Sequence, residues 1–112
     1  MRVERGAEFA HPVERKLAAI FDELGLRWEY EPHTFVLQRR ADGSVVEAFR
    51  PDFYLPDQDM YVEVTTMRQR LTSRKNRKIR RLREQGHVVT ILYRRDLERL
   101  RSKYGFPFDL AA

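Results

Sequence analysis

The chain contains no cysteine among its 112 residues, which excludes disulfides, thiolate metal sites and cysteine nucleophiles. It also lacks any apolar run near the roughly 20 residues that a membrane-spanning helix needs. The first residues have no apolar segment of the kind found in secretory signals. We therefore expect one small domain over residues 1–112, located in the cytoplasm and without a membrane partner.

Acidic residues are missing from residues 66–83, although the whole chain holds 17 of them. The same segment carries nine basic residues, which exceed the net charge of +5, so the rest of the chain is net acidic. Without interleaved acids, the segment has no i,i+4 ion pairs of its own. It predicts a surface for a polyanion such as nucleic acid. The plainer alternative is a solvated helix face.

Apolar spacing and turn residues predict a helix, three or four strands, a helix, a strand and a final helix. We expect an α/β fold in which helices flank a central mixed sheet. The last strand is expected to be buried on both faces. Helical patterns lie at 12–24, at about 73–85 (the basic helix) and at 96–104. Stretches with strand or hairpin patterns lie at 27–31, 35–39, 45–50, 53–55, 60–65 and 88–93.

Two acids occupy matching positions in a predicted antiparallel pair. A four-residue loop at 56–59 would place Asp52 directly opposite Glu63. Opposed side chains have Cβ atoms about 4.5–5.5 Å apart, so the two carboxylates repel unless a cation lies between them. Mg²⁺ is commonly held by one or two carboxylates together with water and substrate phosphate. The pair therefore predicts a metal site, and the alternative is two acids on an exposed sheet face.

The motif around these acids resembles the signature of a known family. Pro51-Asp52, followed by Glu63-Val64-Thr65, resembles the Pro-Asp…(Asp/Glu)-x-Lys signature of the PD-(D/E)XK nuclease superfamily. That superfamily includes restriction enzymes, junction resolvases and mismatch-nicking endonucleases. Its restriction-endonuclease-like core has the order αβββαβ, which the expected elements follow before an extra C-terminal helix.

The resemblance implies specific roles for several residues. Asp52, Glu63 and the Val64 carbonyl would bind Mg²⁺, with Mn²⁺ as a substitute. The family often supplies another acid from its first helix, and Glu14 is the matching position. The alternative role for Glu14 is an acid that interacts favourably with the helix dipole.

Thr65 departs from the signature, because the family carries a lysine at this position. That lysine is expected to activate water and stabilise developing negative charge, which phosphodiester cleavage requires. Thr65 can donate a hydrogen bond but supplies no cation. Either activity has been lost, or the cation comes from another element.

The basic helix offers a replacement for this cation. Lys75 lies four residues from both Leu71 and Ile79, so it is expected on the inward, otherwise apolar stripe. Lys78 is its neighbour on that face, and Gln69 is a second polar group that could orient water. Alternatively, Lys75 extends to solvent from the start of the helix.

These observations predict a Mg²⁺-dependent endonuclease that cleaves phosphodiester bonds in nucleic acid, DNA in the first place. The alternative is a catalytically inactive nuclease-fold module that binds nucleic acid, and RNA as the target stays open. Because the domain is small, we expect it to meet duplex DNA as a homodimer or with a separate recognition subunit. The residues expected to contact nucleic acid are Arg68, Arg70, Arg74, Arg77, Lys78, Arg80 and Arg81.

Overall fold

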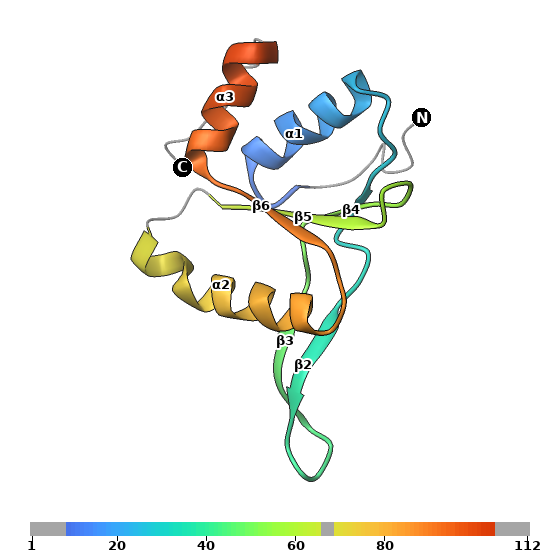
Figure 1. Ribbon diagram of the computed structural model, residues 1–112, viewed down its shortest axis with the longest axis vertical. Coiled ribbons are helices and arrows are strands. Elements are labelled where there is room, and N and C mark those ends of the chain that lie inside the picture. Colours follow the sequence, from blue (N-terminus) through green and yellow to red (C-terminus); the bar gives the residue numbers. More distant parts are fainter. Residues whose placement is uncertain (1–8, 66–68, 105–112) are drawn as a thin grey trace.

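The computed structural model describes residues 9–65 and 69–104, without the side chains of residues 69–72 and 104 (Figure 1). The α/β class is confirmed, and helices and strands follow one another in the expected sequence. Five strands rather than three or four precede the basic helix, which begins earlier than expected, at Gln69. The helices are α1 (Pro12–Glu23), α2 (Gln69–Glu84) and α3 (Arg94–Tyr104). The strands are β1 (Glu29–Tyr30), β2 (Phe35–Arg39), β3 (Val45–Phe49), β4 (Phe53–Leu55), β5 (Met60–Val64) and β6 (Val89–Leu92).

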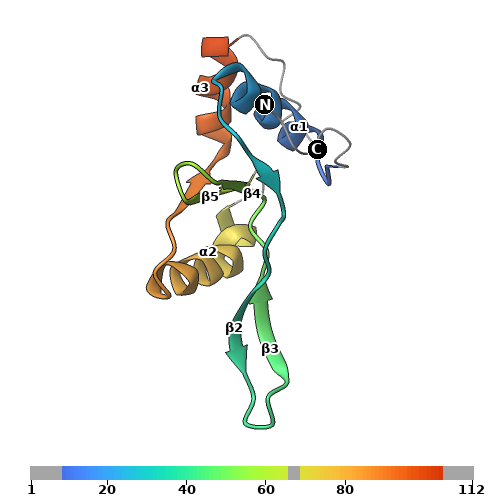
Figure 2. The same ribbon diagram turned by 90° about the vertical axis from the view of Figure 1, so that its right-hand side faces the viewer.

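Four strands form a mixed sheet in the order β1-β4-β5-β6. β4 pairs antiparallel with β1 and β5, whereas β5 and β6 are parallel. β2 and β3 pair only with each other, and their hairpin extends away from the four-stranded sheet (Figure 2). The hairpin is therefore separate from the central sheet. Pro51 stands between β3 and β4 and has no backbone N–H for a ladder, which favours this interruption.

The two faces of the sheet are covered by different helices. α1 and α3 lie on one side and α2 on the other (Figure 1). The larger core joins α1 and α3 to Phe53, Leu55, Val62 and Val64, and the smaller one joins α2 to Tyr61 and Val89. Period-two alternation along β4 and β5 separates these two sets. None of the described helices is long and apolar enough to cross a membrane.

The start of α1 is set by its capping residues. His11 Nδ1 accepts a hydrogen bond from the Val13 N–H at 3.1 Å, and Pro12 is the first helical residue. Proline suits this position because its missing N–H would have no partner there. Gly25 follows the helix with φ of +73°, as expected for a C-terminal glycine. These residues place Glu14 in the first turn, above the sheet.

The expectation for the last strand was wrong. Only Val89 of β6 is buried, Thr90 is exposed, and the preceding Val88 is 57% exposed. The physical reason is topological, because β6 is the last strand in the order of the sheet. A strand at this position lacks the neighbour on one side that shields a central strand.

Ile79 tests the smaller core under α2. Its side chain is fully buried, so Ile79→Ala should lower the free energy of unfolding by about 2–5 kcal/mol. Val88→Ala is the matched control at an exposed site and should change it by about 0.5 kcal/mol or less. Urea denaturation measures both. Equal losses in the two variants would contradict the packing described for α2.

Candidate functional site

Asp52 and Glu63 are both buried, with 8% and 3% of their surfaces exposed. The Asp52 N–H donates to Glu63 Oε1 at 2.9 Å, and the Val64 N–H donates to Asp52 Oδ2 at 2.8 Å. The expected register is confirmed in the neighbouring pairs, Phe53 with Val62 and Leu55 with Met60. The alternative of two acids on an exposed sheet face is therefore wrong.

Lys75 reaches this pair from α2. Its Nζ lies 2.9 Å from Glu63 Oε2 and donates to the Val64 carbonyl at 3.3 Å. The inward stripe is confirmed at Ile79, whose side chain is fully buried. Lys78 Nζ instead donates to the Ala48 carbonyl of β3 at 3.2 Å. Of the two candidate lysines, Lys75 is the one that contacts the acids.

Glu14, in the first turn of α1, is buried. Its Oε1 accepts a hydrogen bond from the Tyr30 hydroxyl at 2.6 Å, and the Tyr30 oxygen accepts from the Ala10 N–H at 3.0 Å. Burial and the hydrogen bond to Glu14 raise the pKa of Tyr30. Strand alternation gave no sign of this polar role, because it placed Tyr30 only as an aromatic core residue.

The acids share one electrostatic environment. Burial, followed by the charges of Glu63 and Glu14, raises the pKa of Asp52 to about 8. Burial also raises the pKa of Glu63, although the Lys75 ammonium opposes the rise. Three carboxylates near one ammonium leave an excess of negative charge when all are ionised. Such an excess favours either a proton or a divalent cation.

The donor set fits Mg²⁺ only as a partly protein-held ion. Among the described residues, no three His, Cys, Asp or Glu side chains are arranged to hold a metal. Two buried carboxylates and the nearby Val64 carbonyl could supply oxygen ligands, and water and substrate phosphate would have to supply the others. This sharing of ligands with substrate is common for Mg²⁺ in phosphoryl chemistry.

The remaining residues expected near the site are placed less fully. Thr65 is buried after β5, and its N–H donates to the Leu92 carbonyl at 2.9 Å. By alternation its side chain shares the face of Glu63. Gln69 and Arg70 begin α2, but their side chains lie outside the described part of the chain, as does all of Arg68.

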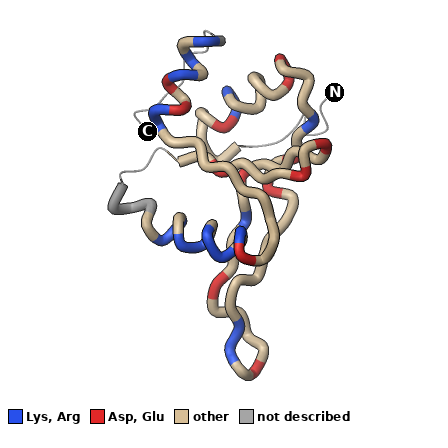
Figure 3. The backbone as a smooth tube through the Cα atoms, viewed as in Figure 1, with Lys and Arg blue, Asp and Glu red and all other residues tan. Residues whose placement is uncertain are grey.

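The basic face of α2 has an acidic partner on the hairpin. Glu47 of β3 lies 2.9 Å from Arg77 and 3.5 Å from Arg81. Figure 3 shows the blue Lys and Arg stretch of α2 running beside the hairpin. Arg74 and Arg80 are exposed, as expected. The basic segment has no acidic partner within itself. Its partner is Glu47, which lies 30 residues from Arg77 in the sequence.

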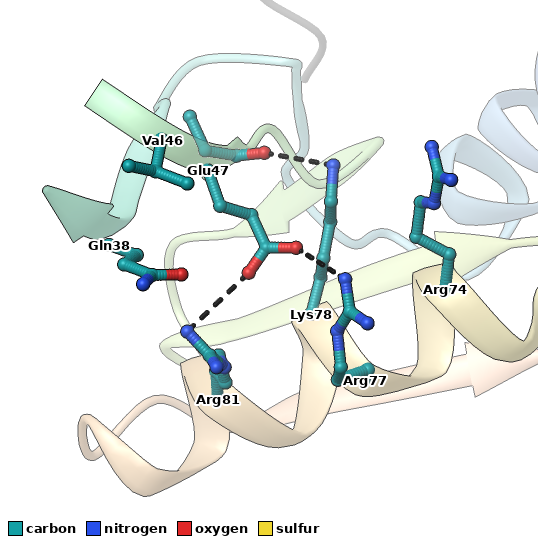
Figure 4. A pocket seen from close by; sticks show the side chains of 8 residues that line it. Gln38, Val46, Glu47, Arg74, Arg77, Lys78 and Arg81 are labelled. Carbon is teal, nitrogen blue, oxygen red and sulfur yellow. Dashed lines mark hydrogen bonds and ion pairs between the residues drawn. The ribbon is translucent and has the colours of Figure 1, made fainter. Parts of the chain in front are cut away.

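A cleft of about 520 Å³ lies between α2 and the β2–β3 hairpin, beside the contacts that join them. Figure 4 shows Glu47 between Arg77 and Arg81, with the Arg74 side chain extended without a contact to the labelled groups. Local sequence patterns could predict neither the pairing of Glu47 with α2 nor the cleft, because two distant segments form its walls. The lining residues are Gln38, Val46, Glu47, Ala48, Arg74, Arg77, Lys78 and Arg81.

The raised pKa of Asp52 predicts a pH-dependent stability. The folded protein holds a proton up to about pH 8 that the unfolded chain releases near its ordinary pKa of 3.8. The stabilisation from this proton is complete below about pH 4 and is lost as the pH rises to about 8. Asp52→Asn should lose much less stability over this pH range. At pH 8 its free energy of unfolding should exceed that of the wild type by on the order of 2 kcal/mol.

Urea denaturation between pH 5 and pH 8.5 in EDTA measures this difference. Asp57→Asn is the control, because the Asp57 carboxylate is exposed and bound to Arg27 at 2.6 Å. Its pKa is lowered by Arg27, so this variant should keep the wild-type slope in that range. An Asp52→Asn variant with the wild-type slope would contradict the raised pKa of Asp52.

Comparisons of this chain with models of protein families, with curated proteins and with solved structures found no match. The resemblance to the PD-(D/E)XK superfamily stays a prediction from the sequence.

Proposed function

We propose that this chain is a Mg²⁺-dependent endonuclease with a restriction-endonuclease-like core, acting on nucleic acid and on DNA in the first place. The observation that carries the proposal is the buried pair of Asp52 and Glu63 with the Lys75 ammonium 2.9 Å from Glu63. Paired carboxylates and a cation at one point are the groups that phosphodiester hydrolysis needs. The same helix that supplies Lys75 also carries the exposed arginines.

The proposed roles follow from where each group lies. Asp52, Glu63 and the Val64 carbonyl would hold Mg²⁺, which when bound polarises a phosphate oxygen and lowers the pKa of water. Lys75 would supply the positive charge that the signature places at residue 65. Thr65 would donate a hydrogen bond on the same side of the sheet. Burial of both acids strengthens each of these electrostatic interactions.

Glu14 and Tyr30 support this site from α1 and β1. The charge of Glu14 contributes to the raised pKa of Asp52, so it also favours the arrival of a cation. The Tyr30 hydroxyl holds the Glu14 carboxylate through a 2.6 Å hydrogen bond. In this proposal Glu14 increases the negative potential at the metal site, and Tyr30 fixes its position.

A second candidate function is a module that binds nucleic acid without cleaving it. The Lys75 contacts favour this alternative, because its ammonium already binds Glu63 and the Val64 carbonyl, two of the three proposed metal ligands. An internal cation of this kind can neutralise the acids without a metal. Binding by the arginines of α2 would persist in such a module.

Recognition of a target would need more surface than α2 provides. Specific protein–DNA interfaces bury about 1,000–2,500 Å² of protein surface. The proposed partners are therefore a second copy of the chain or a separate recognition subunit. Size-exclusion chromatography with and without DNA would detect the homodimer.

Cleavage of supercoiled plasmid tests the proposed function directly. With Mg²⁺ or Mn²⁺, the wild type should nick or linearise the plasmid, and Asp52→Asn should lose at least about 100-fold in rate because a metal ligand is removed. Agarose gels measure both products. If the wild type cleaves no supercoiled, linear or single-stranded substrate with either metal, the binding module is the better description.

Lys75 and Arg80 provide a matched pair on α2. Lys75→Ala should lower the cleavage rate at least about 100-fold, while DNA affinity stays within about threefold, since it removes one of many cationic contacts. Arg80→Ala should weaken DNA binding and leave the rate at saturating DNA nearly unchanged. Fluorescence anisotropy measures binding, and single-turnover cleavage measures the rate.

The same lysine variant should bind metal more tightly. Lys75→Ala frees two oxygens that the ammonium occupies and leaves Glu63 without its cation, so Mg²⁺ should raise its melting temperature more than that of the wild type.

For the cleavage test of the matched pair, equal losses of cleavage in Lys75→Ala and Arg80→Ala would contradict the proposed role of Lys75.

A further inference from the structure

Glu47 places a negative charge inside the most basic region of the protein. Its carboxylate lies 2.9 Å from Arg77 and 3.5 Å from Arg81, and only 11% of its side chain is exposed. The hydrogen bond from Arg77 lowers the pKa of Glu47, so it is ionised at neutral pH. The two arginines hold this carboxylate as they would hold a phosphate.

The cleft around Glu47 remains strongly cationic. Four of its lining residues are basic and one is acidic. Lys78 is held by the Ala48 carbonyl, and the Arg74 side chain makes no hydrogen bond or ion pair with the described part of the chain. A volume of about 520 Å³ lies within the range of about 300–1,000 Å³ typical of ligand sites. The cleft therefore has both the charge and the room to accept an anionic group.

The ion pairs inside the cleft are accessible to a competing anion. The side chains of Arg77 and Arg81 are 52% and 40% exposed. Partly exposed ion pairs contribute little to stability because solvent screens them. A phosphate offers the same arginines charge-assisted and bidentate hydrogen bonds. Replacing the Glu47 carboxylate by a phosphate on these arginines should therefore cost little free energy.

The cleft lies close to the paired acids along two elements. Lys75 and Arg81 are six residues apart on α2, which corresponds to about 9 Å of helix. The chain runs from Glu47 in β3 to Asp52, five residues later. Successive phosphates of one DNA strand advance by about 3.4 Å along the duplex axis. A strand that crosses the acids therefore reaches the cleft within about three nucleotides.

We propose that the cleft between α2 and the β2–β3 hairpin binds a phosphodiester of the nucleic-acid strand, and that Glu47 is an internal anion which this phosphate displaces from Arg77 and Arg81. This proposal rests on the nucleic-acid binding proposed above. It adds where a phosphate binds and which carboxylate competes with it for the arginines. Glu47 holds the two arginines in the free protein and lowers their affinity for phosphate. Its removal should therefore tighten binding.

Glu47→Gln tests the displacement, and Glu98→Gln is the matched control. Glu98 pairs with Arg101 on α3 at 3.0 Å, so each substitution removes one negative charge and releases arginine from an ion pair. In EDTA, Glu47→Gln should bind a fluorescein-labelled DNA duplex about fivefold more tightly than the wild type, and Glu98→Gln should stay within about twofold. Fluorescence anisotropy measures the dissociation constants.

An Arg81→Ala background separates displacement from a general charge effect. Arg81→Ala alone should weaken binding, and in this background the gain from Glu47→Gln should shrink, because one of the competing arginines is gone. Weaker binding by Glu47→Gln would mean that Glu47 only positions the arginines and would overturn the proposal. Equal gains in Glu47→Gln and Glu98→Gln would overturn it too. Melting temperatures check that every variant is folded.

Failure of this proposal is distinguishable from failure of the nuclease. If the wild type does not cleave but Glu47→Gln binds more tightly than Glu98→Gln, the phosphate cleft stands and the enzyme does not. If cleavage depends on Asp52 while Glu47→Gln binds like the wild type, the nuclease stands and the cleft proposal is overturned.

Discussion

The paired hydrogen bonds between Asp52 and β5 are the constraint on which the site depends. Glu63 accepts from the backbone of Asp52, and Asp52 accepts from the backbone of Val64. Asp52 lies in a bend just before β4. At this point each carboxylate takes the place of a main-chain hydrogen-bond acceptor. The side chains that carry the proposed chemistry also fix the position of one strand relative to the next.

This arrangement has an electrostatic cost that the rest of the fold offsets. Burial of carboxylates near one another disfavours their ionised forms, which is why the pKa of Asp52 rises. Lys75 compensates Glu63 from α2, and the stripe around the fully buried Ile79 holds that helix against the sheet. Strongly perturbed pKa values occur both at functional sites and in structural ion-pair networks. The proposed function assigns the acid pair to the first of these.

α2 links the buried acids to the basic surface. Its inward side places Lys75 on Glu63, and its next turns place Arg77 and Arg81 beside the hairpin. The hairpin, in turn, leads directly into Asp52. Movement of the hairpin relative to α2 would change both the cleft and the chain entering the acid pair. The acid pair and the cleft are therefore joined by short stretches of the chain.

The sequence alone determined the elements that have local causes. Strand alternation and the four-residue loop were sufficient for the Asp52–Glu63 register, because side-chain direction in strands repeats every two residues. Helical spacing was likewise sufficient to place Lys75 on the inward face. The buried state of the two acids and the contact of Lys75 with Glu63 required the packed helix and sheet.

Only the tertiary structure decided which distant segments meet. The separation of the β2–β3 hairpin from the central sheet, the partial exposure of β6, the Tyr30–Glu14 hydrogen bond and the position of Glu47 between Arg77 and Arg81 were not predicted from the sequence. Each depends on contacts between segments far apart in the chain, for which local periodicity carries no information. The order of strands in a sheet sets which strand is shielded, and that order is fixed by packing of the whole chain.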